Sequence, residues 1–431
     1  MIDTEARPTG KLAPTDWMRR AETRAVIAAL SADGAEARFI GGCVRDSILK
    51  IPVRDIDIAT PETPERVMQL LAAAAIKAYP TGIDHGTITA IIGDFHFEVT
   101  TLRVDVESHG RRATVAFTDD WLADARRRDF TINTMSCTLD GDIYDPLGGI
   151  EDLGNRRVTF VGVAKERIEE DLLRLLRYFR FQASYGQPPL DIDALAACRL
   201  LAPRLKELSA ERVCGELFRI LLAPNPSETM LLMQGVRILE HILPEAVDFG
   251  RLRMLAWLET TAIRVDSVAP DPLRRLAAML DNPTDGPGVT LASRLRLSNH
   301  EAARLAVMTR PLYKITPDMD QPAIRRALHH LGRDNFRDLT LLAWAGEMAA
   351  EPRHPPERTD KWLALIATTD GWTPLVFPLK GRDALDLGLP PGPKVGTTLT
   401  LVEAWWEAGD FQADRQNCMA KLQAVINFTT T

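Results

Sequence analysis

The pattern of apolar and polar positions changes character along the chain. In the first third, apolar and polar residues alternate over Thr87–Ile92 and Phe95–Leu102, on either side of Gly93-Asp94. Alternation that flanks a Gly-containing turn predicts a β-hairpin, and Asp140-Gly141 marks a second one. From about Lys165 to residue 350, Leu, Ala and Arg recur with a helical period. We therefore predict an α+β fold, in which a small domain with a mixed β-sheet precedes an all-helical region.

Local signals add further elements to the first domain. A helical pattern covers Asp16–Leu30, and the apolar segment Ala37–Ile40 reads as a short strand. Thr63 followed by Pro64 is typical of an N-cap and the first helical position, so we expect a helix that continues through Ala75.

Composition and charge narrow the class of protein. The apolar fraction of 45% and the charged fraction of 26% are ordinary for a globular chain, and no apolar run reaches the roughly 18 residues of a membrane span. The acidic N-terminus has no apolar segment of the kind found in secretory signals, so we expect none, and the five scattered cysteines form no metal-ligand spacing. We expect a cytoplasmic protein with reduced thiols. The net charge of −7 argues against a protein that coats nucleic acid, but it leaves room for a local basic surface.

A first candidate site combines Gly41-Gly42, Arg45, Asp55 and Asp57. Residues two apart on a strand project to one face, so the two carboxylates would lie side by side and repel unless a cation lies between them. Hard oxygen ligands suit Mg²⁺, while a Gly-Gly turn and Arg45 suit a triphosphate. An isolated Asp-x-Asp is more often a solvated strand end. The glycine pair and Arg45 upstream favour the metal interpretation.

A second candidate is Arg126–Asn133, an arginine triplet followed by an apolar segment. An isolated arginine run is usually a solvated basic face. In this context Arg128 could hold a nucleotide's phosphates and Asn133 its sugar.

A third candidate is a helix with charged residues every three positions: Asp171, Arg174, Arg177 and Arg180. We expect one ridge that winds round this helix, with Leu172, Leu176 and Phe179 as the buried stripe. A simple Glu170–Arg174 pair would explain the first arginine, but it leaves the last two without local acidic partners.

An Asp–Arg pair can read a nucleobase. A carboxylate accepts from the amino group of cytosine or adenine while a guanidinium donates to the adjacent ring nitrogen. Uracil and guanine carry the reversed pattern and would leave groups unpaired. Asp171 with Arg174 would thus admit C and A and reject U and G, so the protein itself would be the template.

Two further residues have open roles. Glu98 shares one strand face with His96 and Thr100, and it is either a third carboxylate beside the metal or a hairpin residue satisfied by Arg103 or Thr100. His85 follows a turn sequence, and we expect a locally capped turn histidine.

Together these motifs resemble the class II tRNA nucleotidyltransferase and poly(A) polymerase family of the DNA polymerase β superfamily. Ser209-Ala210-Glu211-Arg212, with Glu216 beyond it, resembles the next helical motif of that family. The resemblance covers roughly residues 35–225.

The resemblance implies a role for each matched position. Asp55 and Asp57 would bind Mg²⁺, with Gly42 and Arg45 at the triphosphate. The nucleotide would also contact further residues: Arg128, Asp171, Arg174, Arg177 and Arg180. A flexible loop at about Val104–Thr118 would help the enzyme to switch from C to A.

The family's fold implies a head, neck, body and tail. Prolines clustered at 352–356 predict a linker near 352–358. The expected domains are an N-terminal helical extension (1–34), a catalytic head (35–155), a neck for nucleobase recognition (156–225), a helical body (226–351) and a tail that we expect to bind tRNA (352–431).

The implied activity is template-independent addition of CMP and AMP to the 3′ end of tRNA. The tRNA 3′-hydroxyl would attack the α-phosphate of CTP or ATP in line, and pyrophosphate would leave. One alternative is a poly(A) polymerase, but that branch carries a basic Gly-Arg-Arg-Phe-type stretch where this chain has Tyr79–Thr87. A partial CC- or A-adding enzyme and a silent RNA-binding protein on the same fold are further alternatives. The sequence leaves the oligomeric state and the tRNA contacts of the tail open.

Overall fold

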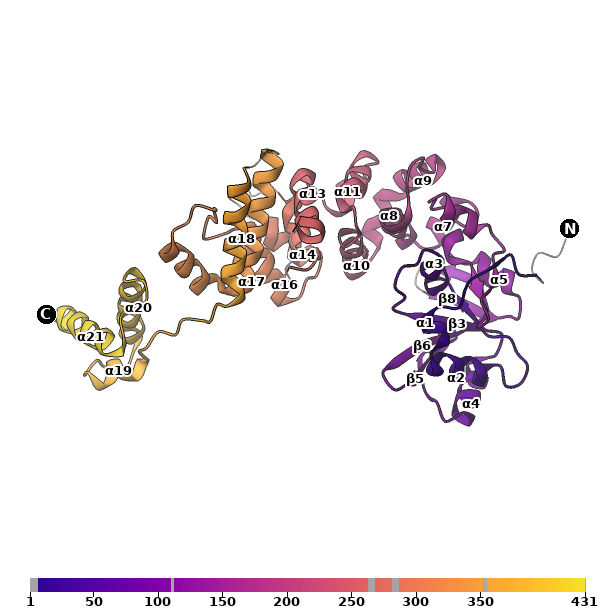
Figure 1. Cartoon of the computed structure of the whole chain (residues 1–431), viewed down its shortest axis with the longest axis horizontal. Coiled ribbons are helices and arrows are strands. Elements are labelled where there is room, and N and C mark those ends of the chain that lie inside the picture. Colours follow the sequence, from indigo (N-terminus) through magenta and orange to yellow (C-terminus); the bar gives the residue numbers. More distant parts are fainter. Residues whose placement is uncertain are drawn as a thin grey trace. The chain divides into compact units, whose positions relative to one another are not determined.

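The structure, a computed structural model, describes residues 7–109, 112–262, 268–280, 287–351, 353 and 355–430. The chain divides into two compact units, Met1–Pro244 and Glu245–Thr431. Figure 1 shows the first unit in indigo to magenta and the second in rose to yellow. Among the described residues every named strand lies in the first unit, while the second is built of helices. The α+β class predicted from the sequence is therefore confirmed.

A mixed sheet forms the centre of the head. Within the described residues it has eight strands in the order β1-β10-β9-β2-β3-β6-β5-β4, and all neighbours are antiparallel except the pair β3 and β6. The strands are β1 (Gly10–Lys11), β2 (Arg38–Ile40), β3 (Ile56–Thr60), β4 (Lys77–Gly82), β5 (Thr87–Ile92), β6 (Phe95–Thr101), β9 (Ser136–Cys137) and β10 (Asp142–Tyr144). Both predicted hairpins, β5–β6 and β9–β10, are present.

Helices cover the sheet and continue beyond it in the first unit. The α-helices are α1 (Asp16–Arg19), α2 (Ala21–Leu30), α3 (Gly42–Ile48), α4 (Pro64–Ala73), α5 (Trp121–Arg126), α6 (Gly149–Gly154), α7 (Ala164–Glu170), α8 (Leu173–Tyr185), α9 (Ile192–Leu201), α10 (Ala210–Leu221), α11 (Pro226–Gly235) and α12 (Leu239–Ile242). Three short 3₁₀ turns join them: η1 (Ile83–His85), η2 (Thr131–Asn133) and η3 (Ala202–Glu207).

The second unit is helical in its described part. Its elements are α13 (Phe249–Trp257), a π-helical turn η4 (Leu258–Ala262), α14 (Pro272–Met279), α15 (Pro287–Arg294), α16 (Asn299–Thr309), α17 (Gln321–Ala350), α18 (Pro356–Asp370), α19 (Gly381–Asp386), α20 (Pro393–Ala408) and α21 (Arg415–Thr430). Gly332, at φ 72°, kinks α17. Helix α18 packs on α17 and begins inside the stretch that the sequence assigned to a linker.

The N-terminal extension contributes a strand as well as helices. Strand β1 joins the head sheet beside β10, and the predicted helix divides into α1 and α2 because Arg20 has an extended ψ of 141°. Trp17 of α1 packs edge-on against Phe39 of β2, with ring centroids 4.7 Å apart. The Thr63 N-cap is confirmed, since its hydroxyl accepts from the Arg66 amide at 3.4 Å, but α4 ends at Ala73.

The stretch Val104–Thr118, expected as a flexible loop, is largely paired. Its backbone forms a separate two-stranded hairpin of β7 (Arg103–His109) and β8 (Arg112–Phe117). Alternation of β-branched and polar residues, as in Val104 and Asp105, favours extended pairing over an open loop. Gly110 and Arg111, part of the charged segment of that expectation, lie outside the described residues.

Candidate active site

The alternation of β3 places its acidic residue on the face opposite the core. Ile56 and Ile58 are 6% and 0% exposed, while Asp57 between them is half-buried on the other face. Asp55 is exposed and lies just before the strand begins. The sequence therefore predicted the face correctly, although Asp55 sits at the strand entrance instead of within it.

Glu98 lies directly across from Asp57. The two residues are Cα partners on the parallel strands β3 and β6, and Glu98 is exposed between the buried Phe97 and Val99. Burial and the neighbouring Glu98 raise the pKa of Asp57 to about 6; Asp55 adds to the rise, while nearby arginines oppose it. This register favours the interpretation of Glu98 as a third carboxylate beside the metal.

The carboxylates at this sheet edge suit a divalent cation. The pKa of Asp57 is raised by burial first and then by the negative charges of Glu98 and Asp55. Such repulsion is relieved when a cation binds between the groups, and carboxylate oxygens are the ligands that Mg²⁺ prefers. Asp55, Asp57 and Glu98 are thus a chemically suitable donor set.

The glycine pair starts α3 and fixes the position of Arg45. Gly41 has φ +67°, a region that favours glycine, and a Cβ there would lie 3.5 Å from the Arg128 guanidinium. Its amide donates to the Met135 carbonyl at 3.1 Å. Gly42 lies against the Arg45 guanidinium, which would be 3.7 Å from an added Cβ. Small residues here allow two arginines to approach the backbone.

A cavity of about 640 Å³ opens beside these residues in the first unit. The described part of its wall carries eight arginines and three aspartates, a surplus of five positive charges. These charged residues are Arg45, Arg103, Arg127, Arg128, Arg174, Arg177, Arg180, Arg212, Asp57, Asp129 and Asp171. A concave surface with this surplus suits a polyanion such as a nucleoside triphosphate.

A buried polar chain joins the three predicted motifs in this wall. Arg45 donates to the Asn133 amide oxygen at 2.6 Å, and the Asn133 amide nitrogen donates to Asp129 at 3.0 Å. Arg177 of α8 donates from Nε to the other oxygen of Asp129 at 2.6 Å. Burial alone would raise the pKa of Asp129, but Arg177 and Asn133 hold it below its usual value. This series of hydrogen bonds connects the head to α8.

Asn133 has a positioning role in this arrangement. Its side chain is buried, and both ends of its amide are committed to Arg45 and Asp129. The amide oxygen and nitrogen each retain one further hydrogen-bonding position. The sugar contact expected from the sequence remains a prediction.

The arginine triplet is organised by a buried carboxylate. Asp124 of α5 accepts from Arg127 at 2.7 Å and from Arg128 at 2.9 Å. Although burial acts to raise the pKa of Asp124, these two arginines lower it overall. Burial and the nearby Arg127 reduce the pKa of Arg103 to about 10. Binding of an anion would relieve the electrostatic repulsion between guanidinium groups that are crowded in this way.

The third motif differs from the expectation at Asp171. Helix α7 ends at Glu170, and Asp171 has extended dihedral angles (φ −147°, ψ 108°) before α8 begins at Leu173. The single ridge expected for these residues is therefore wrong for Asp171. Its carboxylate accepts from the Leu173 amide at 3.1 Å and so competes with helix continuation.

Asp171 has a partner from a distant helix. Arg212 of α10 donates to both carboxylate oxygens of Asp171, at 3.0 and 2.8 Å. Arg174, its predicted partner in base reading, contacts the Glu170 carboxylate and donates to the Arg167 carbonyl at 3.0 Å. Asp171 and Arg174 both line the cavity, so the structure brings both residues of the predicted base-reading pair to it.

The last two arginines of α8 have acidic partners that lie far away in sequence. Arg177 pairs with Asp129, and Arg180 lies 3.3 Å from the buried Glu216 of α10. The sequence interpretation missed Asp129 and Arg212 as cavity residues. Both stand inside quoted motifs, next to Arg128 and Glu211 respectively, and that adjacency was the available signal.

Family models match both parts of this site region. Residues 37–159 match the model described as "Poly A polymerase head domain", and residues 189–249 match "Probable RNA and SrmB- binding site of polymerase A". The head and its site are therefore of the polymerase-type nucleotidyltransferase class.

Similar proteins define the family. The chain is 32% identical over 396 residues to the Homo sapiens "CCA tRNA nucleotidyltransferase 1, mitochondrial". The matched region covers 90% of this chain and 86% of that protein. The chain is also 37% identical over 237 residues to a Streptococcus pneumoniae "CCA-adding enzyme", and this match covers 54% of this chain and 58% of that protein. The chain belongs to the CCA tRNA nucleotidyltransferase family.

Solved structures share the fold. The Bacillus stearothermophilus CCA-adding enzyme in complex with CTP has a TM-score of 0.70 at 24% identity and covers 94% of this chain and 97% of that one. The Thermotoga maritima CCA-adding enzyme complexed with tRNA has a TM-score of 0.57 at 17% identity and covers 93% and 94%. The head and helical arrangement implied by the resemblance are thereby confirmed.

The cellular location is less defined. None of the described helices combines the length and apolar character that a membrane crossing needs. The Homo sapiens and Danio rerio relatives are both named as mitochondrial. A cytoplasmic location therefore stays a prediction.

Proposed function

We propose that this enzyme adds CMP and AMP, from CTP and ATP, to the 3′ end of tRNA without a nucleic-acid template. The observation that carries the proposal is the arginine-rich cavity of the first unit, which both Asp57 and Asp171 line. Asp57 belongs to the acidic strand edge needed for phosphoryl chemistry. Asp171 and the guanidinium groups can hydrogen-bond to a base.

We assign the metal to Asp55, Asp57 and Glu98, with Mg²⁺ as the ion. Bound there, Mg²⁺ would supply Lewis-acid stabilisation of the charge that develops on the phosphate oxygens. The raised pKa of Asp57 supports this assignment because burial and the neighbouring Glu98 both disfavour its bare charge, which a bound cation would neutralise.

The arginines would bind and orient the triphosphate. Arg45 is fixed by Asn133 and by Asp46, to which its Nε donates at 2.9 Å, so its guanidinium needs little reorganisation when the ligand arrives. Arg128 is held by Asp124 in the same way. Preorganised donors of this kind contribute most where negative charge develops in a site that excludes water.

Base selection is assigned to Asp171 and Arg174. Arg212 occupies part of the Asp171 carboxylate, but a carboxylate has about four acceptor positions and can still accept from an exocyclic amino group. Arg212 would then fix the direction of that carboxylate. Uracil and guanine would meet the wrong hydrogen-bonding groups.

The proposal is tested with tRNA that lacks its 3′ end and with labelled CTP and ATP, supplied separately and together. We expect CMP incorporation with CTP alone, and AMP incorporation that depends on CTP. Asp55→Ala and Asp57→Ala should incorporate neither nucleotide while keeping the circular-dichroism spectrum of the unmodified protein. Turnover by either variant would contradict the metal assignment.

The same assay separates the alternatives. A long A tract on any RNA would identify a poly(A) polymerase, and arrest after CMP would identify a partial CC-adding enzyme. Cell fractionation tests the proposed cytoplasmic location, with recovery in mitochondria as the contrary result.

A further inference from the structure

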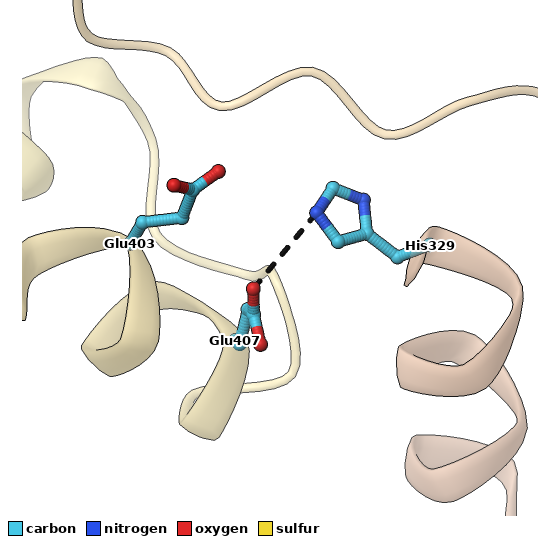
Figure 2. Close-up of side chains that lie close together, drawn as sticks. All are labelled: His329, Glu403 and Glu407. Atoms are coloured by element: carbon cyan, nitrogen blue, oxygen red, sulfur yellow. Dashed lines mark ion pairs between the residues drawn. The ribbon is translucent and has the colours of Figure 1, made fainter. Parts of the chain in front are cut away.

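A second group of metal-ligand side chains lies in the second unit. His329 belongs to α17, and Glu403 and Glu407 belong to α20. One ligand atom of each residue lies within 4.8 Å of the others, and all three residues are half-buried. Figure 2 shows the imidazole and both carboxylates converging on one space between the two helices. None of the three lines the arginine-rich cavity.

In the part of the chain that the structure describes, the two carboxylates of this group have only imidazoles as basic partners within ion-pair distance. Glu403 and Glu407 stand four residues apart on α20, where like charges on neighbouring turns repel. Among the described residues, Glu403 forms no hydrogen bond or ion pair. Arg325 of α17 donates from both its Nε and a terminal nitrogen to Asp410. Within the described part, the basic groups within ion-pair distance of these two carboxylates are the imidazoles of His329 and His330, both at Glu407.

The surrounding contacts hold the three side chains in place. The His330 Nε2 and one oxygen of Glu407 are 2.9 Å apart, which leaves the other oxygen facing His329. The His329 ring packs against Phe411 and Trp406, with centroids 5.1 and 6.0 Å away. Metal-binding carboxylates and imidazoles are commonly oriented by such second contacts.

We propose that His329, Glu403 and Glu407 bind a divalent transition-metal ion, with Zn²⁺ as the test ion, and that this ion fastens α20 to α17. An imidazole combined with carboxylates suits Zn²⁺ better than Mg²⁺ or Ca²⁺, which prefer oxygen ligands alone.

The spacing fits an ion of this kind. Zinc at its usual bond lengths places tetrahedral ligand atoms roughly 3.4 Å apart. The His329 Nε2 and Glu407 Oε1 are 3.9 Å apart, so small side-chain rotations would complete the site. The side chains of His329 and Glu407 are 16% and 18% exposed, which leaves room for entry and for a water ligand.

The consequence concerns the C-terminal helices. Helices α19, α20 and α21 share their own apolar core, which includes Val402, Trp406 and Leu422. Beyond that core, α20 and the turn after it meet α17 through His329, His330 and Arg325. A metal ion bridging α17 and α20 would therefore restrict the motion of the C-terminal helices.

The test is metal binding to the purified full-length chain. The protein is stripped with a chelator and dialysed into excess Mg²⁺, which competes for the catalytic carboxylates, and is then titrated with Zn²⁺ in a calorimeter. We expect His329→Gln and Glu403→Gln to lose one equivalent of Zn²⁺ that the unmodified chain binds. His330→Gln should keep this equivalent but bind it roughly tenfold more weakly, because His330 orients Glu407.

Matched controls are His300→Gln and Glu357→Gln, which lie on α16 and α18 and should bind like the unmodified chain. Glu403→Gln is nearly isosteric and removes a repulsion, so its metal-free melting temperature should match or exceed that of the unmodified chain. Zn²⁺ should slow amide exchange in α20 of the unmodified chain but not in the Glu403 variant. Equal Zn²⁺ stoichiometry and affinity in the unmodified chain and in both ligand variants would overturn the proposal. Loss of binding in His330→Gln but not in His329→Gln would overturn the ligand assignment.

Discussion

At the residue scale, Asp57 is a side chain whose environment opposes its charge. It is half-buried, faces Glu98 across the parallel strand pair and has a pKa raised to about 6. The same arrangement that penalises a bare carboxylate favours a bound cation. Stability and function therefore place opposite demands on this position.

This conflict predicts the behaviour of Asp57→Asn. The folded-state pKa exceeds the ordinary value of 3.8, so the stabilising contribution of Asp57 is complete below that value and is lost as the pH rises through about 6. With a chelator present at about pH 8, Asn should raise the free energy of unfolding by about 1 to 2 kcal/mol. Near pH 4 the gain should vanish. Thermal melts at the two pH values measure the difference.

The control for this variant is Asp94→Asn, in the exposed turn between β5 and β6. It should change stability by less than about 0.5 kcal/mol at either pH. A lower melting temperature for Asp57→Asn at about pH 8 would show that the carboxylate is stabilised by its surroundings and would contradict the account.

A second prediction at this scale concerns Asp171 and its partner. Asp171→Ala should raise misincorporation of U and G while CTP-dependent turnover persists at a reduced rate, because the hydrogen-bond acceptor for the amino group is gone. Arg212→Ala should shift selectivity in the same direction but less, because it only frees the Asp171 carboxylate to rotate. Single-turnover rates with each of the four nucleotides measure both effects. Unchanged selectivity in Asp171→Ala would reject the base-reading role.

At the scale of elements, the contact between α8 and α10 supports the cavity wall. Glu216 is 1% exposed and lies 3.3 Å from Arg180 and 2.9 Å from Arg219. Arg180, whose pKa burial and the neighbouring Arg177 reduce to about 10, lines the cavity. The two helices are thus joined by a buried charge pair at the place where the ligand would bind.

Removing this pair should destabilise the first unit. Glu216→Ala leaves Arg180 without its buried carboxylate, which we expect to cost roughly 3 kcal/mol. Glu216→Gln keeps the volume and a hydrogen-bond acceptor and should cost less. Denaturant unfolding followed in the full chain measures both variants. Equal stability of Glu216→Ala and the unmodified protein would show that the pair contributes nothing.

The elements also show what a sequence can predict. Thr63 as an N-cap and Gly93 as a hairpin turn were predictable because their determinants lie within a few residues. The break at Asp171 was not, since it accompanies a pair with Arg212, 41 positions away. The partner of Arg177 is likewise 48 positions away. Side-chain pairing across folded helices depends on tertiary structure, which periodicity does not encode.

At the scale of the whole molecule, charge is distributed unevenly. The chain carries a formal net charge of −7, yet the cavity wall in its described part has a surplus of five positive charges. The cavity wall therefore offers a local surface that can attract RNA although the chain as a whole is acidic. This agrees with the sequence argument against a protein that coats nucleic acid.

Salt should consequently weaken substrate binding more strongly than the chemical step. Raising NaCl from about 50 to 200 mM should increase the KM for tRNA at least tenfold if roughly four or more phosphates are contacted, with a smaller change in kcat. Steady-state kinetics over a salt series measure this. A KM for tRNA that does not depend on salt would contradict binding through the arginine-rich surface.

We infer that side chains of this protein alone determine which nucleotides are added and in which order. The most direct test incubates tRNA lacking its 3′ end with the unmodified enzyme and all four nucleoside triphosphates, and then sequences the 3′ ends of the products. We expect ends that read C-C-A and extend no further, with U and G at background level. Ends with a run of A, or with U and G in proportion to their supply, would contradict it.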